Sequence, residues 1–389
     1  MKIAFITPNY PPTICGVGDH TWHLAQAMMR QGVEVHIICS ASQTAAAATN
    51  ETVHAVVEQW NRVGVEAILN VVAAIRPDWL VVQNVPSAFH PKGLPFILLS
   101  LYRRLNQLNV PILTVFHEIM IRTEGNLKKT ITSFLQTRVI ADGMSRRSAA
   151  IVTSIDFYGN VLKKWRDRLT LIPIGSNILP VDISLPMQND LRRKHQIPND
   201  AQVVCTFGNR DVTAYLPDFD KLKQDFPNLI WLICGRTSTP SVILKSRSYI
   251  RYVGEMLPDD IYRHLSLGDV FFMPDFVSPT GEGGTCNKSG SLACAMWLGI
   301  PIVGTKGDLN NALLVDGENI LLTDVLTENA VYDALKSCFA SEKRSAKLGI
   351  NALDFYETKL HWSVLAEQFL GIMYPSVKTR RRQFSAVKD

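Results

Sequence analysis

The chain has 389 residues, which exceeds the roughly 250–300 at which a single hydrophobic core stops growing, so two domains are expected. Apolar residues make up 47% of the sequence and charged residues 19%, a composition that suits an ordinary soluble globular protein. The net charge of +5 is too mild to demand a polyanionic partner, so nucleic acid is not expected.

No apolar run approaches the ~18–20 residues that a membrane-spanning helix needs, and the sequence begins directly with a predicted strand rather than with a signal peptide. The seven cysteines show no metal-ligand spacing such as C-x-x-C. Cys39, Cys205 and Cys234 lie in apolar strand-like runs, so we interpret the cysteines as small buried hydrophobes. These features predict a cytoplasmic protein.

The opening stretch, KIAFITPNYPPTICGVGDHTWHLAQAMMRQG, combines a strand, a glycine loop and a helix. Residues 2–7 predict a buried parallel strand, and apolar residues at helical spacing predict a helix that ends at Gly32. The loop between them, Gly16-Val17-Gly18, is similar to a dinucleotide-binding loop. However, Thr21 stands where that fingerprint has its third glycine, and the strand at residues 33–39 is not followed by an acidic residue for a ribose. A dinucleotide site is therefore not favoured.

Along the whole chain, short β-branched runs alternate with helical patterns, which is the signature of βα units and parallel sheets. The first set of predicted strands covers residues 2–7, 33–39, 79–83, 112–116, 150–153 and 170–172. A segment rich in Pro, Asn and Asp follows. The second set of predicted strands covers residues 203–207, 229–234, 250–253, 270–273, 302–305 and 320–322. The fold class expected is α/β, with two Rossmann-like, doubly wound parallel-sheet domains joined near residues 175–186.

We place the N-terminal domain at residues 1–177 and the C-terminal domain at residues 178–359. A last helix at about residues 360–375 is expected to pack back onto the N-terminal domain. Residues 376–389 are predicted to form a disordered basic tail.

Basic residues also gather at positions 128–129, 146–147 and 163–168. Solvated helix faces are the favoured interpretation of these clusters. The alternative is a basic surface of the N-terminal domain that contacts anionic lipid head groups peripherally, at the inner surface of the membrane.

Ligands of open parallel sheets bind at the carboxyl ends of the strands, so the residues that follow each strand are the candidates for a site. His117 follows the strand at residues 112–116, and the carboxylate of Glu118 beside it could set the tautomer of the imidazole. A structural histidine tied to the backbone is the alternative.

In the second domain, the strand at residues 203–207 is followed by Gly208 and Arg210. Gly208 permits close approach to the backbone, and the planar fork of Arg210 matches a phosphate. The alternative for Arg210 is a surface pair with Asp211 or Asp218.

The stretch PDFVSPTGEGGTCNKSGSLACAMWLGIPIVGTKGD leads from a predicted strand through a glycine-rich loop to a helix that starts near Ser289-Gly290-Ser291. A helix N-terminus reached through Gly and Ser presents unpaired N–H groups and the positive end of the helix dipole, which together form an anion site. Lys288 beside it would add a full charge. A plain serine cap on a core helix is the alternative, but a long glycine-rich loop favours a binding loop.

Several of these motifs together resemble family 4 glycosyltransferases of the GT-B fold, over nearly the whole chain. The opening stretch resembles the first loop and helix of that family, VFHE its cleft histidine, and AMWLGIPIVGT with VDGENILL its nucleotide-binding core. The resemblance implies GT-B architecture with an interdomain cleft. It implies a retaining transferase that moves a sugar from a nucleotide-diphosphate sugar to a glycan, lipid-linked or small-molecule acceptor.

The same resemblance implies no cofactor and no metal, because positive side chains and a helix N-terminus hold the leaving diphosphate. His117 would contact the donor sugar and Arg210 the diphosphate. The Gly16 segment would face the diphosphate and the sugar across the cleft. The catalytic candidates are His117 and Glu282, and the donor-binding candidates are Gly16, Val17, Gly18, Gly208, Arg210, Lys288, Ser289, Gly290 and Ser291.

Two positions depart from the family pattern. The family places a lysine a few residues after Arg210, but residues 212–216 contain none, so the substitute must come from Lys221, Lys223, Arg236 or Lys288. The family also carries two glutamates eight positions apart, where this chain has Cys286 and Cys294. Part of the family has a Ser-Gly-Ser-Leu type sequence at the helix start, as residues 289–292 do. Glu282 is then the nearest carboxylate for a sugar hydroxyl.

The missing glutamates keep two other functions open. A nucleotide-sugar 2-epimerase is similar in architecture and would bind the same donor without an acceptor. A catalytically silent protein that binds a sugar nucleotide or a glycan would show binding without turnover.

Overall fold

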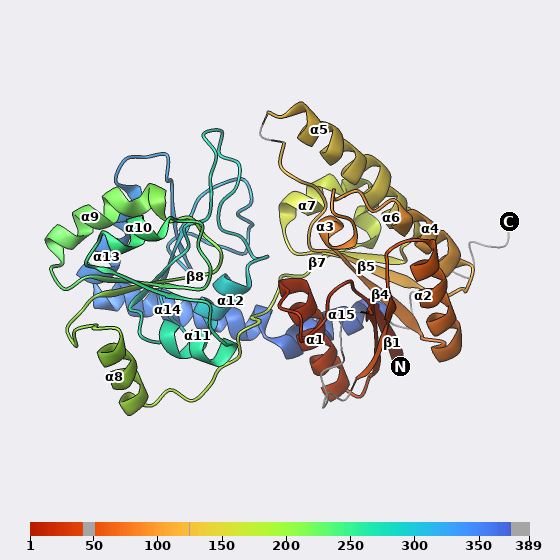
Figure 1. The fold of residues 1–389 in the computed structure, drawn as a ribbon, viewed down its shortest axis with the longest axis horizontal. Coiled ribbons are helices and arrows are strands. Elements are labelled where there is room, and N and C mark those ends of the chain that lie inside the picture. Colours follow the sequence, from red (N-terminus) through yellow and green to blue (C-terminus); the bar gives the residue numbers. More distant parts are fainter. Residues whose placement is uncertain (42–50, 124, 375–389) are drawn as a thin grey trace. The chain divides into compact units, whose positions relative to one another are not determined.

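The computed structural model describes residues 1–41, 51–123 and 125–374. The chain divides into two units, one of Met1–Pro173 together with the segment from Trp362 onward, and one of Ile174–His361 (Figure 1). The domain boundary predicted from the sequence, at residue 177, differs from the division after Pro173. The basic tail predicted at residues 376–389 lies outside the described residues.

The described part of the first unit holds a seven-stranded parallel sheet in the order β3-β2-β1-β4-β5-β6-β7. The strands are β1 (Lys2–Ile6), β2 (Glu34–Ser40), β3 (Thr52–Val57), β4 (Trp79–Asn84), β5 (Ile112–Phe116), β6 (Ala150–Thr153) and β7 (Leu169–Leu171). The helical segments are α1 (Gly16–Arg30), α2 (Arg62–Ile75), α3 (Pro86–Phe89), α4 (Ile97–Asn106), α5 (Leu127–Phe134), η1 (Leu135–Ala141), α6 (Asp142–Arg147), α7 (Asp156–Val161), η2 (Lys163–Arg168) and α15 (Trp362–Met373).

The central strands of this sheet form because their apolar residues are buried on both faces, as parallel strands covered by helices require. All five residues of β5 are buried. Strand β3 was not predicted. It lies at the edge of the sheet, paired with β2, and four of its six residues are only half-buried. An edge strand needs fewer apolar residues, so its sequence signal is weaker.

Helix α15 packs on the first unit although it comes last in the sequence. Trp362, Leu365 and Phe369 are buried in the same apolar cluster as Leu24 and Met28 of α1. The two helices therefore cover the sheet together, and the candidate residues at the start of α1 are held against a rigid core.

The second unit holds a six-stranded parallel sheet in the order β10-β9-β8-β11-β12-β13. The strands are β8 (Val203–Phe207), β9 (Ile230–Cys234), β10 (Ile250–Gly254), β11 (Val270–Phe272), β12 (Ile302–Thr305) and β13 (Leu321–Thr323). The helical segments are α8 (Leu185–Lys194), η3 (Thr213–Tyr215), α9 (Leu216–Asp225), α10 (Ser241–Lys245), α11 (Pro258–Leu265), α12 (Gly290–Trp297), α13 (Ala330–Ala340), α14 (Glu342–Phe355) and η4 (Tyr356–Leu360). The predicted α/β class with two doubly wound parallel sheets is confirmed.

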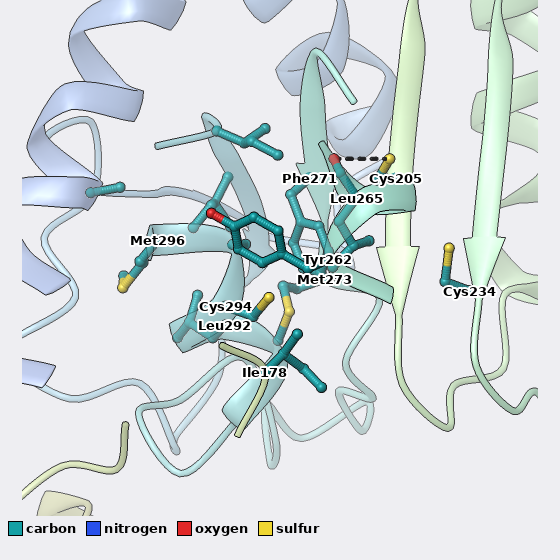
Figure 2. Close-up of a cluster of buried hydrophobic side chains, with 14 of the residues drawn as sticks. Ile178, Cys205, Cys234, Tyr262, Leu265, Phe271, Met273, Leu292, Cys294 and Met296 are labelled. Atoms are coloured by element: carbon teal, nitrogen blue, oxygen red, sulfur yellow. Dashed lines mark hydrogen bonds between the residues drawn. The ribbon is translucent and has the colours of Figure 1, made fainter. Parts of the chain in front are cut away.

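Apolar clusters cover both faces of the second sheet. In the cluster of Figure 2, Phe271 and Met273 pack with Leu292 of α12. Six of the seven cysteines are buried. Burial raises the pKa of the Cys234 and Cys294 thiols to about 12, so both stay protonated and pack as small apolar groups.

Candidate functional site

The glycine segment of the first unit lies in a helix rather than in a loop. Helix α1 begins at Gly16, with Cys15 as its extended N-cap, so Gly16, Val17 and Gly18 form its first turn. A Cβ atom on Gly18 would lie 3.0 Å from the carbonyl oxygen of Asn9. Gly18 therefore allows the proline-rich segment before the helix to pack against its start. The expectation of a glycine loop is wrong, although the helix start still offers a positive dipole end.

His117 lies at the carboxyl end of β5, as predicted, and it is buried. Its Nε2 atom is 2.7 Å from Oε1 of Gln83, the next-to-last residue of the neighbouring strand β4. Because an amide oxygen only accepts, Nε2 carries the proton in this arrangement. The Glu118 side chain is exposed. Gln83, rather than the expected Glu118, is therefore the side chain that orients Nε2.

Another histidine, His20 of helix α1, packs against His117. The ring centroids of His20 and His117 are 4.7 Å apart in an edge-on arrangement, and the ring of Trp362 also contacts His20, with a centroid distance of 5.2 Å. Within the described part of the chain, neither ring nitrogen of His20 has a hydrogen-bond partner. Burial, with smaller contributions from His117 and His23, lowers the pKa of His20 well below its usual value. His20 is therefore neutral.

Sequence reasoning missed three residues at this end of the first sheet, which are His20, Gln83 and Asp19. Burial raises the pKa of the Asp19 carboxyl group to about 6. The change from apolar to polar residues at the end of strand β4 was the available signal for Gln83. The sequence held no such signal for His20 and Asp19, because polar residues are common at the start of a helix and do not stand out there.

In the second unit, Arg210 reaches the N-terminus of helix α12. Its Nε donates to Oδ1 of Asp275 at 3.1 Å, and its guanidinium also donates to the Phe207 carbonyl. Weaker contacts run to Oγ of Ser289 at 3.4 Å and to Oγ of Ser291 at 3.5 Å. The structure therefore brings three of the predicted site residues together.

The acid that pairs with Arg210 is Asp275, whereas Asp211 and Asp218 were the surface partners considered. Asp211 instead accepts from the Thr239 hydroxyl at 2.9 Å, and Asp218 accepts from the backbone N–H of Tyr332 at 3.0 Å. Asp275 is two residues beyond the sequence-predicted strand at 270–273, at the carboxyl end where candidates were expected. It was missed because its partner lies 65 residues away in sequence.

Asp275 is held in place from several sides. Its Oδ2 accepts from the Thr285 hydroxyl at 3.0 Å. Its backbone carbonyl accepts from the hydroxyls of Tyr215 at 3.2 Å and Thr305 at 3.0 Å. Asp275 can therefore fix the direction of the Arg210 guanidinium.

Gly208 makes room for Arg210. Its φ of +115° is rarely adopted by other residues, and a Cβ atom there would lie 2.2 Å from Nη1 of Arg210 and 3.1 Å from Oγ of Ser291. The expected close approach to Gly208 is thus made by the arginine and Ser291.

The first turn of α12 is accessible to a ligand. Ser289 is its N-cap and accepts from the backbone N–H of Leu292 at 3.4 Å. A Cβ atom on Gly290 would meet only ordinary contacts, the nearest being Asn177 at 3.8 Å. The helix start therefore combines a serine cap with space next to the main chain, so the capping and anion-binding interpretations are compatible.

The four residues considered as substitutes for the missing lysine lie in different surroundings. Lys221 donates to Oδ1 of Asn329 at 3.2 Å, Lys223 to the Leu229 carbonyl at 3.3 Å, and Arg236 forms an exposed pair with Glu255 at 2.8 Å. Lys288 directly precedes the N-cap Ser289. Its position favours Lys288 as the second positive charge.

Glu282 lies in the loop between β11 and α12. Its backbone N–H donates to Oγ of Ser278 at 3.1 Å, and its carbonyl accepts from the backbone N–H of Ser278 at 2.8 Å. No hydrogen bond or ion pair within the described residues joins its carboxylate to Arg210. The carboxylate that the structure does place beside Arg210 is Asp275.

A cavity of about 620 Å³ opens beside this cluster. Its lining includes Arg210, Asp275 and Tyr215, together with the exposed side chains of Phe276 and Leu326. Its volume falls within the ~300–1,000 Å³ typical of small-molecule sites, and it combines a charge pair with apolar walls.

Comparisons with known proteins bear on the fold and on the family of the first unit. Residues 14–178 match the model of Glycosyltransferase Family 4, and no curated protein matches the sequence. The structure of HepE from Anabaena, in complex with UDP and glucose, is similar at 14% identity, covering 95% of this chain and 98% of that chain with a TM-score of 0.66. Sucrose-phosphate synthase from Thermosynechococcus elongatus is similar at 16% identity, covering 99% of each chain with a TM-score of 0.70.

A UDP-N-acetylglucosamine 2-epimerase is more distant, at 9% identity and a TM-score of 0.58 over 95% of this chain and 94% of that chain. At these identities the solved structures establish the fold, while the family match rests on the first unit. The chain therefore has the two-sheet GT-B fold of these glycosyltransferase structures, and its residues 14–178 match the Glycosyltransferase Family 4 model.

Proposed function

We propose that the protein transfers a sugar from a nucleotide-diphosphate sugar to a hydroxyl of a glycan, a lipid-linked or a small-molecule acceptor, with retention and without a metal ion. The observation that carries this proposal is the meeting of Arg210 with Ser289 and Ser291 at the N-terminus of α12. The complex of HepE with UDP and glucose, on the same fold, supports a nucleotide-sugar donor.

The chemistry of this cluster suits a leaving diphosphate. When the bond between the sugar and the diphosphate breaks, negative charge grows on the phosphate oxygens. Arg210 can donate from its planar fork, the first turn of α12 adds N–H groups and a positive dipole end, and Lys288 adds a charge. These groups would balance the charge that a metal ion neutralises in other transferases.

Asp275 would act on the donor through Arg210. Its Oδ1 lies 3.1 Å from both Nε and Nη2 of Arg210, which fixes the guanidinium with Nη2 toward Ser289 and Nη1 toward Ser291. The contacts to the two hydroxyls are long, at 3.4 and 3.5 Å, so phosphate oxygens can replace them at little cost. Asp275 is therefore a positioning residue.

His117 would contact the donor sugar from the first unit. Its Nε2 proton is engaged by Gln83, and its neighbour His20 is neutral. An imidazole fixed in this way suits hydrogen bonding to an uncharged sugar hydroxyl. Glu282 remains a candidate for a second contact with the sugar.

A thermal-shift screen against UDP-, GDP- and ADP-sugars tests the donor first, because a ligand at one hundred times its Kd should add about 2.7 kcal/mol to the free energy of unfolding. The best donor is then incubated with acceptor panels, with and without a chelator, and the anomeric configuration of the product is read by NMR. Conversion of the donor without any acceptor would show an epimerase instead. Binding without turnover on any acceptor would show a sugar-nucleotide-binding protein.

A further inference from the structure

Helix α5 presents a stripe of large apolar side chains to solvent. Leu127, Ile131 and Phe134 are 74%, 53% and 59% exposed. Their spacing of four and then three residues places them on one face of the helix. An exposed apolar side chain is ordinary when it stands alone, as Ile350 does on the fully described helix α14, but a stripe over successive turns marks an interaction surface.

The opposite side of this helical segment is anchored to the first unit. The segment continues from α5 through η1 into α6, and Ser133, Gln136 and Ile140 are buried. The Gln136 side chain donates to the Gly93 carbonyl at 2.9 Å and accepts from the backbone N–H of Ile121 at 2.8 Å. In Figure 1, α5 stands clear of the sheet of the first unit. The apolar stripe is thus held outward by the fold.

The charged residues within the stretch 126–141, which contains the stripe, are all positive. Lys128 and Lys129 lie on α5 and Arg138 lies on η1, while residues 126–141 contain no Asp or Glu. Lys128 and Arg138 are exposed. Apolar side chains flanked by cations are the combination that anionic lipid bilayers bind, because the apolar groups enter the acyl boundary while the cations meet the phosphates.

The other basic clusters of the first unit are engaged locally. Arg146 and Lys164 both pair with Asp142 at 3.3 Å, and Arg168 stacks on Trp165 at 4.8 Å and donates to the Ser148 carbonyl. They also lack an apolar stripe. Of the three clusters noted in the sequence, the one on α5 is therefore the best suited to a bilayer.

We propose that α5 docks the first unit on the surface of an anionic phospholipid bilayer. Leu127, Ile131 and Phe134 enter the boundary between head groups and acyl chains, and Lys128 and Arg138 lie at the level of the lipid phosphates. Three side chains on one short helix fall well below the roughly 1,000 Å² of a stable protein interface, so a bilayer fits better than a protein partner. The contact is peripheral, since no helix of the described residues is long and apolar enough to cross a membrane.

Co-sedimentation of the full chain with vesicles tests this surface. Vesicles of phosphatidylcholine with phosphatidylglycerol should bind the native chain, and vesicles of phosphatidylcholine alone should bind it much more weakly. The triple variant Leu127→Ser, Ile131→Ser, Phe134→Ser should lose at least about tenfold in affinity, and Lys128→Gln about fivefold. The matched controls Ile350→Ser and Lys347→Gln, both exposed on α14, should bind as the native chain does.

The proposal is overturned if the native chain does not bind anionic vesicles, or if the triple variant binds them as well as the native chain does. Hydrogen exchange provides a measurement without substitutions, because docking should slow exchange at residues 127–134 when anionic vesicles are added. Unchanged exchange there contradicts the proposal. Nucleotide-sugar affinity of the triple variant should stay native, so the outcome is independent of the proposed transferase function.

Discussion

The carboxyl ends of the two sheets carry opposite kinds of chemistry. In the first unit, burial disfavours charge on two neighbours of His117, because it lowers the pKa of His20 and raises that of Asp19 to about 6. In the second unit, Arg210 is a charged group stabilised by Asp275. The proposed roles follow this contrast, because the sugar assigned to His117 is an uncharged set of hydroxyls and the diphosphate assigned to Arg210 is an anion.

The largest effect is expected from a substitution of His117 in the first unit. His117→Ala should lower turnover by about a hundredfold or more, because a positioned imidazole acts on the sugar in the transition state. Affinity for a nucleoside diphosphate should stay close to native. Steady-state kinetics and calorimetry measure the two quantities, with His54→Ala on the edge strand β3 as a control. Equal losses in turnover and in nucleotide affinity would rule out a role confined to the sugar.

The second-largest effect is expected from substitutions of Arg210 in the second unit. Arg210→Ala should weaken binding of the diphosphate by about 3 kcal/mol, because charge-assisted hydrogen bonds are lost and Asp275 is left without its partner. Arg210→Lys should restore only part of the affinity, since an ammonium lacks the planar fork. Arg236→Ala, which removes an exposed arginine of the same unit, is the matched control. Native affinity in the Arg210→Ala variant would show that Arg210 does not contact the diphosphate.

A smaller loss is expected at the start of α12. Gly290→Val should weaken binding of a nucleoside diphosphate by about 1–2 kcal/mol and leave a nucleoside unaffected, because the new side chain obstructs approach to the N–H groups. The protein itself has room for a Cβ there, so a folding defect is not expected. Calorimetric titration with nucleoside, monophosphate and diphosphate should show a loss that grows with phosphate number. A uniform loss would indicate a disturbed fold.

The smallest effect is a pH dependence at Asp19. Because its folded-state pKa of about 6 lies above the unfolded value of 3.8, the folded state binds the proton more tightly, and stability is lost as pH rises from about 4 to 6. Asp19→Asn should therefore raise the free energy of unfolding at pH 7 by about 1 kcal/mol, allowing for partial exposure, and leave it unchanged at pH 4. Denaturant titrations at both pH values check this. An equal effect at both would contradict the raised pKa.

Most of the fold was predictable from the sequence, because a strand buried on both faces needs a continuous apolar run that is easy to see. Strand β5 was located to the residue for this reason. Strand β3 was missed because an edge strand is half-buried and tolerates His54 within it. The start of α1 was misjudged because two glycines usually indicate a loop, whereas Gly18 here allows a close packing contact.

The candidate site was predictable only in part. Arg210 and the start of α12 were found because residues after parallel strands and at helix starts can be identified from local sequence. Asp275 and Gln83 were not, because each is defined by a side-chain contact with a residue at least 34 positions away. The expected role of Glu282 followed from its place in a loop, and a loop position does not specify which way a carboxylate points.

The central claim is that Arg210 and the N-terminus of α12 hold one and the same diphosphate. A double-mutant cycle tests it most directly, with calorimetric affinities for a nucleoside diphosphate measured on the native chain, Arg210→Ala, Gly290→Val and the double variant. If the diphosphate is shared, the two losses in binding free energy are not additive, with a coupling of at least about 0.5 kcal/mol, and a nucleoside without phosphates shows no coupling. Additive losses within about 0.3 kcal/mol, or no loss in either single variant, would contradict a shared diphosphate site.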